Sequence, residues 1–167
     1  MKTLFFAGGC FWGVQHFFDQ FPGVVKTEAG YANGPDAETD YKKVCASSGH
    51  AETVRVDFNE AVISPEKLID FYFLAVDPLS VNRQGHDTGI QYRTGIYSND
   101  EELRETARRK LAELAGKLGQ TPAVECGPLE NFCPAEEYHQ KYLEKNPSCY
   151  CHLPAALFRL AAAQKES

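Results

Sequence analysis

The chain contains, from Thr3 to Phe18, the stretch Thr-Leu-Phe-Phe-Ala-Gly-Gly-Cys-Phe-Trp-Gly-Val-Gln-His-Phe-Phe. Its first five residues form an apolar run of strand length, and the apolar residues at its end recur at helical spacing. Cys10 therefore lies at a turn from a strand to a helix, which Gly8 and Gly9 allow to be sharp. At such a turn, backbone N–H groups and the helix dipole favour the thiolate form of a cysteine.

Cys10 has competing interpretations. On residue type alone, a cysteine is most often a small buried hydrophobe. Lys2 and the apolar residues before Cys10 superficially fit a lipoprotein signal, but the run Leu4–Ala7 is shorter than the roughly 7–15 residues that a signal needs. Phe11 and Trp12 supply large apolar surface beside the thiol. These neighbours suit a nucleophile that faces an apolar substrate group, although a buried cysteine stays open at this point.

Length and composition limit the class of protein. A chain of 167 residues can bury a real core, so we expect a single domain over residues 1–167 with a tail from about residue 146. A net charge of −6 argues against non-specific binding of nucleic acid, and no apolar run reaches the roughly 18 residues that span a membrane. We expect no secretory signal, a cytoplasmic location and a monomer.

Six cysteines occur in the chain, at positions 10, 45, 126, 133, 149 and 151. Without a secretory signal, metal binding or thiol catalysis is expected rather than a disulfide framework. Cys149, Cys151 and His152 form a C-x-C-H run, but no second pair complements it at zinc-site spacing, so we predict no metal site. Cys45, Cys126 and Cys133 lie in or beside apolar segments, which indicates packed side chains.

Strands and helices are expected to alternate along the chain. The pattern predicts strands over 3–7, 23–32, 51–58, 94–97 and 123–128, helices over 11–18, 64–76, 98–118 and 134–145, a long loop over 33–49 and an irregular stretch over 77–93. This alternation favours an α/β (α+β) two-layer sandwich with a mixed, mostly antiparallel sheet, helices packed on it and an irregular C-terminal tail. A parallel doubly wound sheet is the less favoured alternative.

Three polar clusters interrupt the core pattern. Glu52 follows Gly49-His50-Ala51 and shares a strand face with three apolar residues, so burial would raise its pKa and let it hold a proton near neutral pH. A glutamate that faces solvent at the end of the strand is the equal alternative. Tyr41 lies in the loop before it.

The second cluster spans residues 83–93, where Asp87 and Tyr92 could position a polar substrate atom or belong to a loop that satisfies its own backbone. The third spans residues 147–152, where a tail thiol would suit a resolving cysteine that attacks a sulfenic acid. His16 and His139 are assigned to structure.

Together these residues resemble the A-type peptide methionine sulfoxide reductases. The run Gly9-Cys10-Phe11-Trp12-Gly13 is similar to the family signature. Other motifs follow in the family's order: Tyr41, Gly49-His50-Ala51-Glu52, Arg83-Gln84-Gly85 with Asp87, Gln91-Tyr92-Arg93, residues 128–132, residues 134–140 and Lys145-Asn146-Pro147. The resemblance covers residues 3–152.

The resemblance implies a ferredoxin-like sandwich and a role for each unusual residue, without a cofactor. Cys10 would attack the sulfoxide sulfur, Glu52 would donate a proton, and Tyr41 and Tyr92 would add hydrogen bonds. Asp87 would help to orient the site. The pocket for the S-methyl group would be formed by Phe11 and Trp12. The products would be methionine and a sulfenic acid, which a second cysteine would convert to a disulfide that thioredoxin reduces; the resemblance also implies the S epimer.

The chain departs from the family pattern at several positions. Val76-Asp77-Pro78 stands where the family has His-Asp-Pro, His86 where it has Asn, and Cys133 where it has an aromatic residue. In the tail, the resemblance assigns the resolving role to Cys151, and Cys149 is an extra thiol that could share or replace it.

Two other classes of function stay open at this level. A thiol peroxidase or a cysteine hydrolase would also use Cys10, but a hydrolase needs a paired histidine, and neither His16 nor His50 is well placed. A redox- or zinc-regulated binding module would instead use Cys149, Cys151 and His152, and bound zinc would distinguish it.

Overall fold

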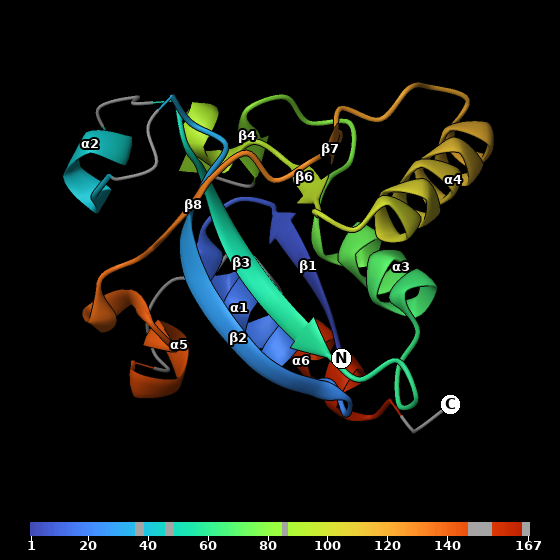
Figure 1. Cartoon of the computed structure of the whole chain (residues 1–167), viewed down its shortest axis with the longest axis horizontal. Coiled ribbons are helices and arrows are strands. Elements are labelled where there is room, and N and C mark those ends of the chain that lie inside the picture. Colours follow the sequence, from blue (N-terminus) through green and yellow to red (C-terminus); the bar gives the residue numbers. More distant parts are fainter. Residues whose placement is uncertain (36–38, 46–48, 85–86, 147–154, 165–167) are drawn as a thin grey trace.

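Six strands form one sheet in the computed structural model, which describes residues 1–35, 39–45, 49–84, 87–146 and 155–164 (Figure 1). In spatial order they are β7 (Glu125–Gly127), β6 (Gly95–Tyr97), β1 (Lys2–Ala7), β3 (Ala51–Phe58), β2 (Val24–Ala32) and β8 (Phe132–Pro134). Neighbours pair antiparallel except β6 and β7, which are parallel. This confirms the predicted mixed, mainly antiparallel sheet. The ferredoxin-like classification stays a prediction.

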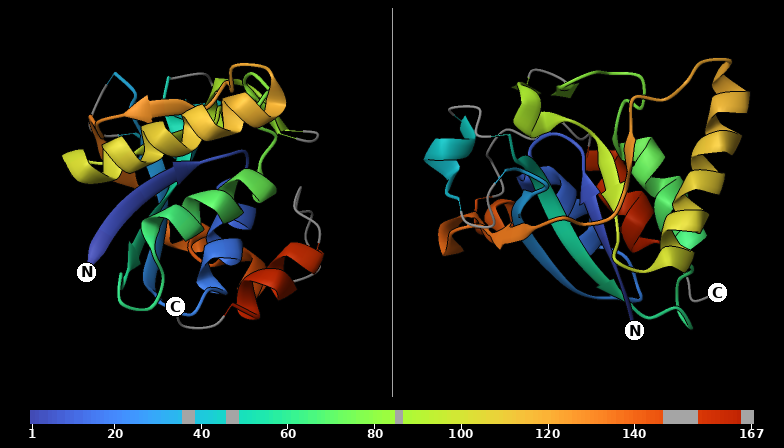
Figure 2. Two further views of the ribbon diagram at one scale, coloured as in Figure 1. Left: turned by 90° about the vertical axis from the view of Figure 1, so that its right-hand side faces the viewer. Right: turned by 45° about the horizontal axis from the view of Figure 1, so that its top comes forward.

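The described helices are α1 (Phe11–Asp19), α2 (Tyr41–Cys45), α3 (Pro65–Ala75), α4 (Glu101–Leu118), α5 (Tyr142–Lys145) and α6 (Ala155–Ala162), with the 3-10 turns η1 (Ile90–Tyr92) and η2 (Glu137–His139). Residues of α1, α3, α4 and α6 belong to the core that covers one face of this sheet. Alternate strand residues such as Phe6 and Val54 form one core with Phe17 of α1, Leu68 of α3 and Leu103 of α4. In Figure 1, α1 and α6 lie behind the strands, and Figure 2 gives two other directions.

Helix boundaries follow from capping chemistry. Ser64 accepts a hydrogen bond from the Lys67 N–H at 3.2 Å, and Pro65 occupies the first turn of α3, as the sequence predicts. Asp100 caps α4 in the same way, and Gly119 ends that helix with a φ of 67°. Among the described helices, none is long and apolar enough to cross a membrane.

Four predicted segments are corrected by the structure. Pro134 does not begin a helix; it ends β8, where it lies opposite Gly30 of β2, and the helical residues that follow are limited to η2 and α5. The strand β8 was not predicted. The loop over 33–49 contains α2, and the strand predicted over 123–128 is shorter. The tail is not irregular throughout, because α6 packs its Ala161 into the core.

Candidate active site

Cys10 lies at the N-terminus of α1, directly after β1. Gly9, with a φ of 82°, makes the sharp turn between the two elements, and Cys10 occupies the capping position with extended backbone angles. The first turn of α1 contains no acidic residue, and the cysteine is partly exposed. The predicted strand-to-helix turn is therefore present, with the positive end of the helix dipole at the thiol.

Glu52 lies beside this turn on the face of the sheet that packs against the helices. It is directly opposite Tyr31 in the β2–β3 register, and only 1% of its surface is exposed. One oxygen, Oε1, accepts a hydrogen bond from the backbone N–H of Phe11 at 3.2 Å. The other oxygen, Oε2, is buried and has no hydrogen-bond partner among the described residues. The alternative of a solvent-facing glutamate is thus wrong.

Burial changes the acidity of Glu52. Loss of solvation raises the pKa of its carboxyl group to about 8, the Phe11 N–H opposes that shift, and the charge of Asp87 adds to it. The carboxyl group is therefore protonated at neutral pH. Because Oε1 accepts from Phe11, Oε2 is the oxygen available to carry a proton that the site can donate.

Aromatic rings surround the start of α1. The indole N–H of Trp12 donates to His139 Nδ1 at 2.9 Å, and the indole stacks on Tyr142 with ring centres 3.7 Å apart. The ring of Phe11 lies 5.2 Å from that of His139 and 5.5 Å from that of Tyr31. These contacts fix both residues that were predicted to form an apolar wall beside Cys10.

Tyr41, the first residue of α2, contacts the same group of rings. Its ring centre is 4.6 Å from that of His139, and its backbone N–H donates to Glu136 Oε2 at 3.3 Å. In Figure 1, α2 and α5 lie at the left, next to the edge of the sheet that β2 and β8 form.

The 83–93 loop contributes Asp87 and Tyr92 from two short elements. Asp87 lies in β5 (Asp87–Thr88), which pairs with β4 (Arg83–Gln84), and its charge reaches Glu52. Tyr92 is half-buried in η1, which packs against β3. Gly89, with a φ of 143°, makes one of the predicted tight turns, and Gly85 lies outside the described residues.

Other predicted residues lie away from this group or outside the description. Cys149, Cys151, His86 and His152 fall in segments that the structure does not describe. Cys126 packs against the main core from β7, where burial raises the pKa of its thiol. Within the described ranges, no three residues of the metal-binding types come together.

Three residues of this cluster have no predicted role in the site: Tyr31, Glu136 and His139, the last of which was assigned to structure. His139 is 1% exposed, its Nε2 has no hydrogen-bond partner in the described part of the chain, and burial lowers its pKa. Trp12 and His139 are 127 positions apart, so their contact leaves no local pattern in the sequence. The one signal for His139 is that the indole N–H of Trp12 needs an acceptor when it is buried. Glu136 and Tyr31 meet through the pairing of β8 with β2, a pairing of distant segments that no local pattern predicts.

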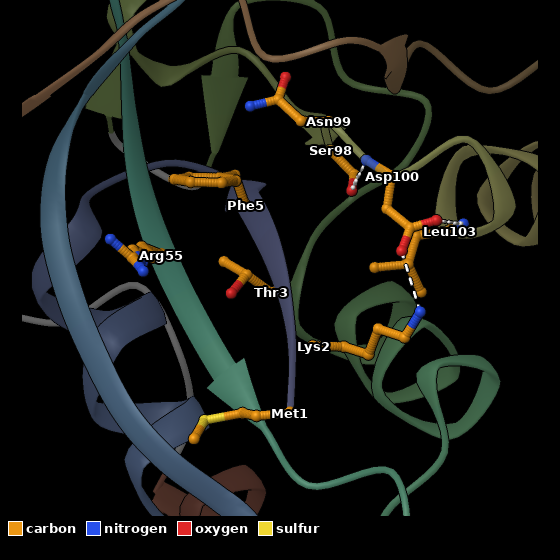
Figure 3. Close-up of a pocket in the computed structure, with 9 residues that line it drawn as sticks. All are labelled: Met1, Lys2, Thr3, Phe5, Arg55, Ser98, Asn99, Asp100 and Leu103. Carbon is orange, nitrogen blue, oxygen red and sulfur yellow. Dashed lines mark hydrogen bonds and ion pairs between the residues drawn. The ribbon is translucent and has the colours of Figure 1, made fainter.

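A pocket of about 380 Å³ lies away from this cluster, between β1, β3 and the start of α4 (Figure 3). Thr3, Phe5 and Arg55 line it from the face of the sheet opposite to the core residues Leu4 and Val54. The ion pair between Lys2 and Asp100 occupies its rim at 3.0 Å. It contains none of the predicted site residues, so its size does not identify the reactive centre.

The cluster at the start of α1 can carry out acid-assisted nucleophilic chemistry. It combines a partly exposed thiol at a helix N-terminus, a buried carboxyl group that holds a proton at neutral pH, and an aromatic wall. A substrate that fits these groups has an apolar substituent and an oxygen that must be protonated.

Known proteins are similar to this chain in both sequence and fold. A family model described as peptide methionine sulfoxide reductase matches residues 2–167. A peptide methionine sulfoxide reductase MsrA of Lachnoclostridium phytofermentans is 48% identical over 158 residues, which cover 94% of this chain and 95% of that protein. The crystal structure of reduced Mxr1 from Saccharomyces cerevisiae has a TM-score of 0.85 and 36% identity, over 90% of this chain and 88% of that one. Mxr1 in complex with Trx2 has a TM-score of 0.60 and 25% identity, over 84% of each chain.

Proposed function

The chain belongs to the peptide methionine sulfoxide reductase family, and on that premise we propose that Cys10, Glu52 and the rings around them form its active site. The protein is an oxidoreductase that reduces methionine sulfoxide to methionine. The observation that carries the assignment is the position of a protonated, buried carboxyl group beside the thiol at the start of α1.

In the first step the Cys10 thiolate attacks the sulfoxide sulfur of the S epimer. This attack forms a bond between Sγ and the substrate sulfur. As the protonated oxygen passes to Sγ, that bond and the substrate S–O bond break, so the substrate sulfur gains two electrons and leaves as the thioether of methionine, while Cys10 loses two electrons and becomes a sulfenic acid. Phe11 and Trp12 hold the methyl substituent, and the stacking of Trp12 on Tyr142 supports this role by fixing the indole.

The sulfoxide oxygen must be protonated as its bond to sulfur weakens. We assign that proton to Glu52, because its raised pKa keeps it protonated and its Oε2 has no hydrogen-bond partner in the described part of the chain. Tyr41 and Tyr92 supply further hydrogen bonds to the oxygen, and Asp87 orients the site.

The second step regenerates the thiol. A tail thiol, assigned to Cys151 with Cys149 as the alternative, attacks the sulfenic sulfur, forms a disulfide with Cys10 and releases water. A thioredoxin then reduces the disulfide with its own dithiol, a step that the complex between Mxr1 and Trx2 supports. The supply of reduced thioredoxin fits the cytoplasmic location that we propose for this protein.

A comparison of wild type with Cys10→Ser tests the assignment. Both proteins are given a peptide that contains methionine sulfoxide, with dithiothreitol as reductant. We expect the wild type to form methionine and the variant to form none. Activity that survives in Cys10→Ser would overturn the mechanism, and a wild type that reduces hydrogen peroxide but not the sulfoxide would favour the peroxidase alternative.

A further inference from the structure

Glu136, which lies just before η2, joins three tyrosines from different elements. Its Oε1 accepts a hydrogen bond from the Tyr31 hydroxyl of β2 at 2.8 Å. Its Oε2 accepts from the backbone N–H of Tyr41, the first residue of α2, at 3.3 Å and from the Tyr138 hydroxyl at 3.4 Å. The two oxygens therefore tie the start of α2 to β2, the strand next to the edge strand β8.

Glu136 performs this role as a carboxylate. Burial raises its pKa, but its own backbone N–H and the donors from Tyr31 and Tyr41 outweigh burial and hold the pKa below its usual value. Both oxygens accept from these donors, which suits the ionised form, because a protonated carboxyl group would have to place its own O–H among them.

The anchor of this contact is rigid. Tyr31 is fully buried, lies between Cys133 of β8 and Glu52 of β3 in the strand register, and packs its ring against Phe11. Its hydroxyl therefore has a fixed position relative to the turn that carries Cys10. Through the Tyr31 hydroxyl, Glu136 takes its own position from the same strands that position Glu52.

The other end of the contact reaches a proposed catalytic group. Tyr41 belongs to a helix of only five residues, which cannot be stable by itself. The ring of Tyr41 packs on His139, which accepts the hydrogen bond from Trp12. A hydrogen bond to the Tyr41 N–H thus fixes the backbone from which this phenol extends.

We propose that Glu136 is a positioning residue for the reduction step, acting through Tyr41. Tyr31 anchors the carboxylate to the sheet, and the carboxylate holds Tyr41 where its hydroxyl can donate to the sulfoxide oxygen. Glu136 itself does not contact the substrate. The inference rests on the proposed function, in which Tyr41 is a hydrogen-bond donor in the first step.

Glu136→Gln is the direct test, because the amide has one acceptor oxygen where the carboxylate has two, so the Tyr31 hydroxyl and the Tyr41 N–H can no longer donate to separate oxygens. We expect kcat for the first step to fall roughly 10- to 100-fold, the range that a misplacement of about 1 Å produces, with KM changed less than about threefold. Glu137→Gln is the matched control; the Glu137 side chain is 92% exposed, and we expect wild-type kinetics.

A double-mutant cycle separates positioning from a general loss of structure. Single-turnover rates are measured for wild type, Glu136→Gln, Tyr41→Phe and the double variant, at a temperature where all four are folded by circular dichroism. If Glu136 acts through the Tyr41 hydroxyl, Glu136→Gln slows the Tyr41→Phe protein by less than about threefold. An equal slowing in both backgrounds, or Glu136→Gln kinetics like those of wild type, would overturn the inference.

The same assay distinguishes failure of the inference about Glu136 from failure of the proposed function. Wild type and Cys10→Ser are measured in every experiment, and the proposed function is supported as long as wild type reduces the peptide and Cys10→Ser does not. If Tyr41→Phe reacts as fast as wild type while Cys10→Ser is inactive, the positioning role of Glu136 is wrong and the role of Cys10 is unaffected.

Discussion

The backbone N–H of Phe11 donates a hydrogen bond to Glu52 Oε1 at 3.2 Å and so joins the first turn of α1 to the start of β3. The first N–H groups of a helix have no partner within the helix. Here the N–H of Phe11 holds the buried carboxyl group of Glu52 next to Cys10, the residue before Phe11. The same turn thus directs the positive end of its dipole at Cys10 and holds the carboxyl group that we propose as the acid of the first step.

The rate of the first step should fall as pH rises through about 8. Glu52 donates only in its protonated form, and burial raises its pKa to about 8, so the fraction that can donate decreases above that value. The measurement is the single-turnover rate of methionine formation from pH 6 to pH 10.

Glu52→Gln is the matched variant for this profile. We expect its rate to be lower than that of wild type by a factor on the order of 10²–10⁴ and to lack the decline near pH 8. A variant that is as fast as wild type, or that keeps the same decline, would remove Glu52 from the role of acid.

Glu52 should also make the stability of the fold depend on pH. Its pKa is higher in the folded protein than the ordinary value of 4.5, so between pH 4.5 and about 8 the folded state binds more protons than the unfolded state. The free energy of unfolding therefore decreases as pH rises across this window. The full contribution of one group shifted to about 8 is on the order of 5 kcal/mol.

Urea denaturation of wild type and Glu52→Gln at pH 5, 6, 7 and 8 measures this contribution. We expect the variant to gain stability relative to wild type as pH rises, because glutamine does not titrate. A difference between the two proteins that stays constant over the four pH values would contradict the burial of an ionisable Glu52.

Gly8, two residues before Cys10, should not tolerate a side chain. A Cβ at this position would collide with Cγ1 of Val76, which is buried at the end of α3, and would lie 3.4 Å from the Tyr72 ring. We expect Gly8→Ala to reduce the free energy of unfolding by about 1–3 kcal/mol. In a Val76→Ala background the same change should cost at least about 0.5 kcal/mol less.

Gly116→Ala provides the control for this series. Gly116 lies within α4, and nothing is within 4 Å of the point that an alanine methyl group would occupy there. Alanine should therefore stabilise the helix by about 0.5–1 kcal/mol. Equal costs for Gly8→Ala in the wild-type and Val76→Ala backgrounds would show that Val76 is not the obstacle.

Local sequence patterns correctly predict those strands and helices that are determined by residues close together in the chain. The alternation over 51–58 identifies both β3 and the face that carries Glu52, since side chains of a strand alternate with a period of two. Ser64 followed by Pro65 marks the start of α3 because both residues act within one helical turn. Burial of Glu52 could not be read from the pattern alone, because whether a strand end faces the core depends on what packs there.

Errors arose where distant segments determine the structure. Phe132–Pro134 is too short to show a strand pattern and becomes β8 only by pairing with β2. Its last residue, Pro134, has no N–H and suits the end of an edge strand as well as the start of a helix. The prediction of an irregular tail is wrong at α6, where alanine favours the helix and Ala161 is buried in the core.

The tail cysteines should separate the two half-reactions. Cys151→Ser is expected to keep the single-turnover rate of methionine formation, because in the proposed mechanism Cys10 alone performs that step, and to lose turnover with thioredoxin as reductant. Cys149→Ser should keep both. Cys126→Ser, at a partly buried thiol in β7, is the control for the loss of a thiol elsewhere in the chain and should also keep both activities.

Turnover with thioredoxin that is lost in Cys149→Ser and retained in Cys151→Ser would exchange the two assignments. Loss only when both are replaced would show that either thiol can attack the sulfenic acid, because a resolving thiol needs access to that sulfur rather than one fixed position in the chain.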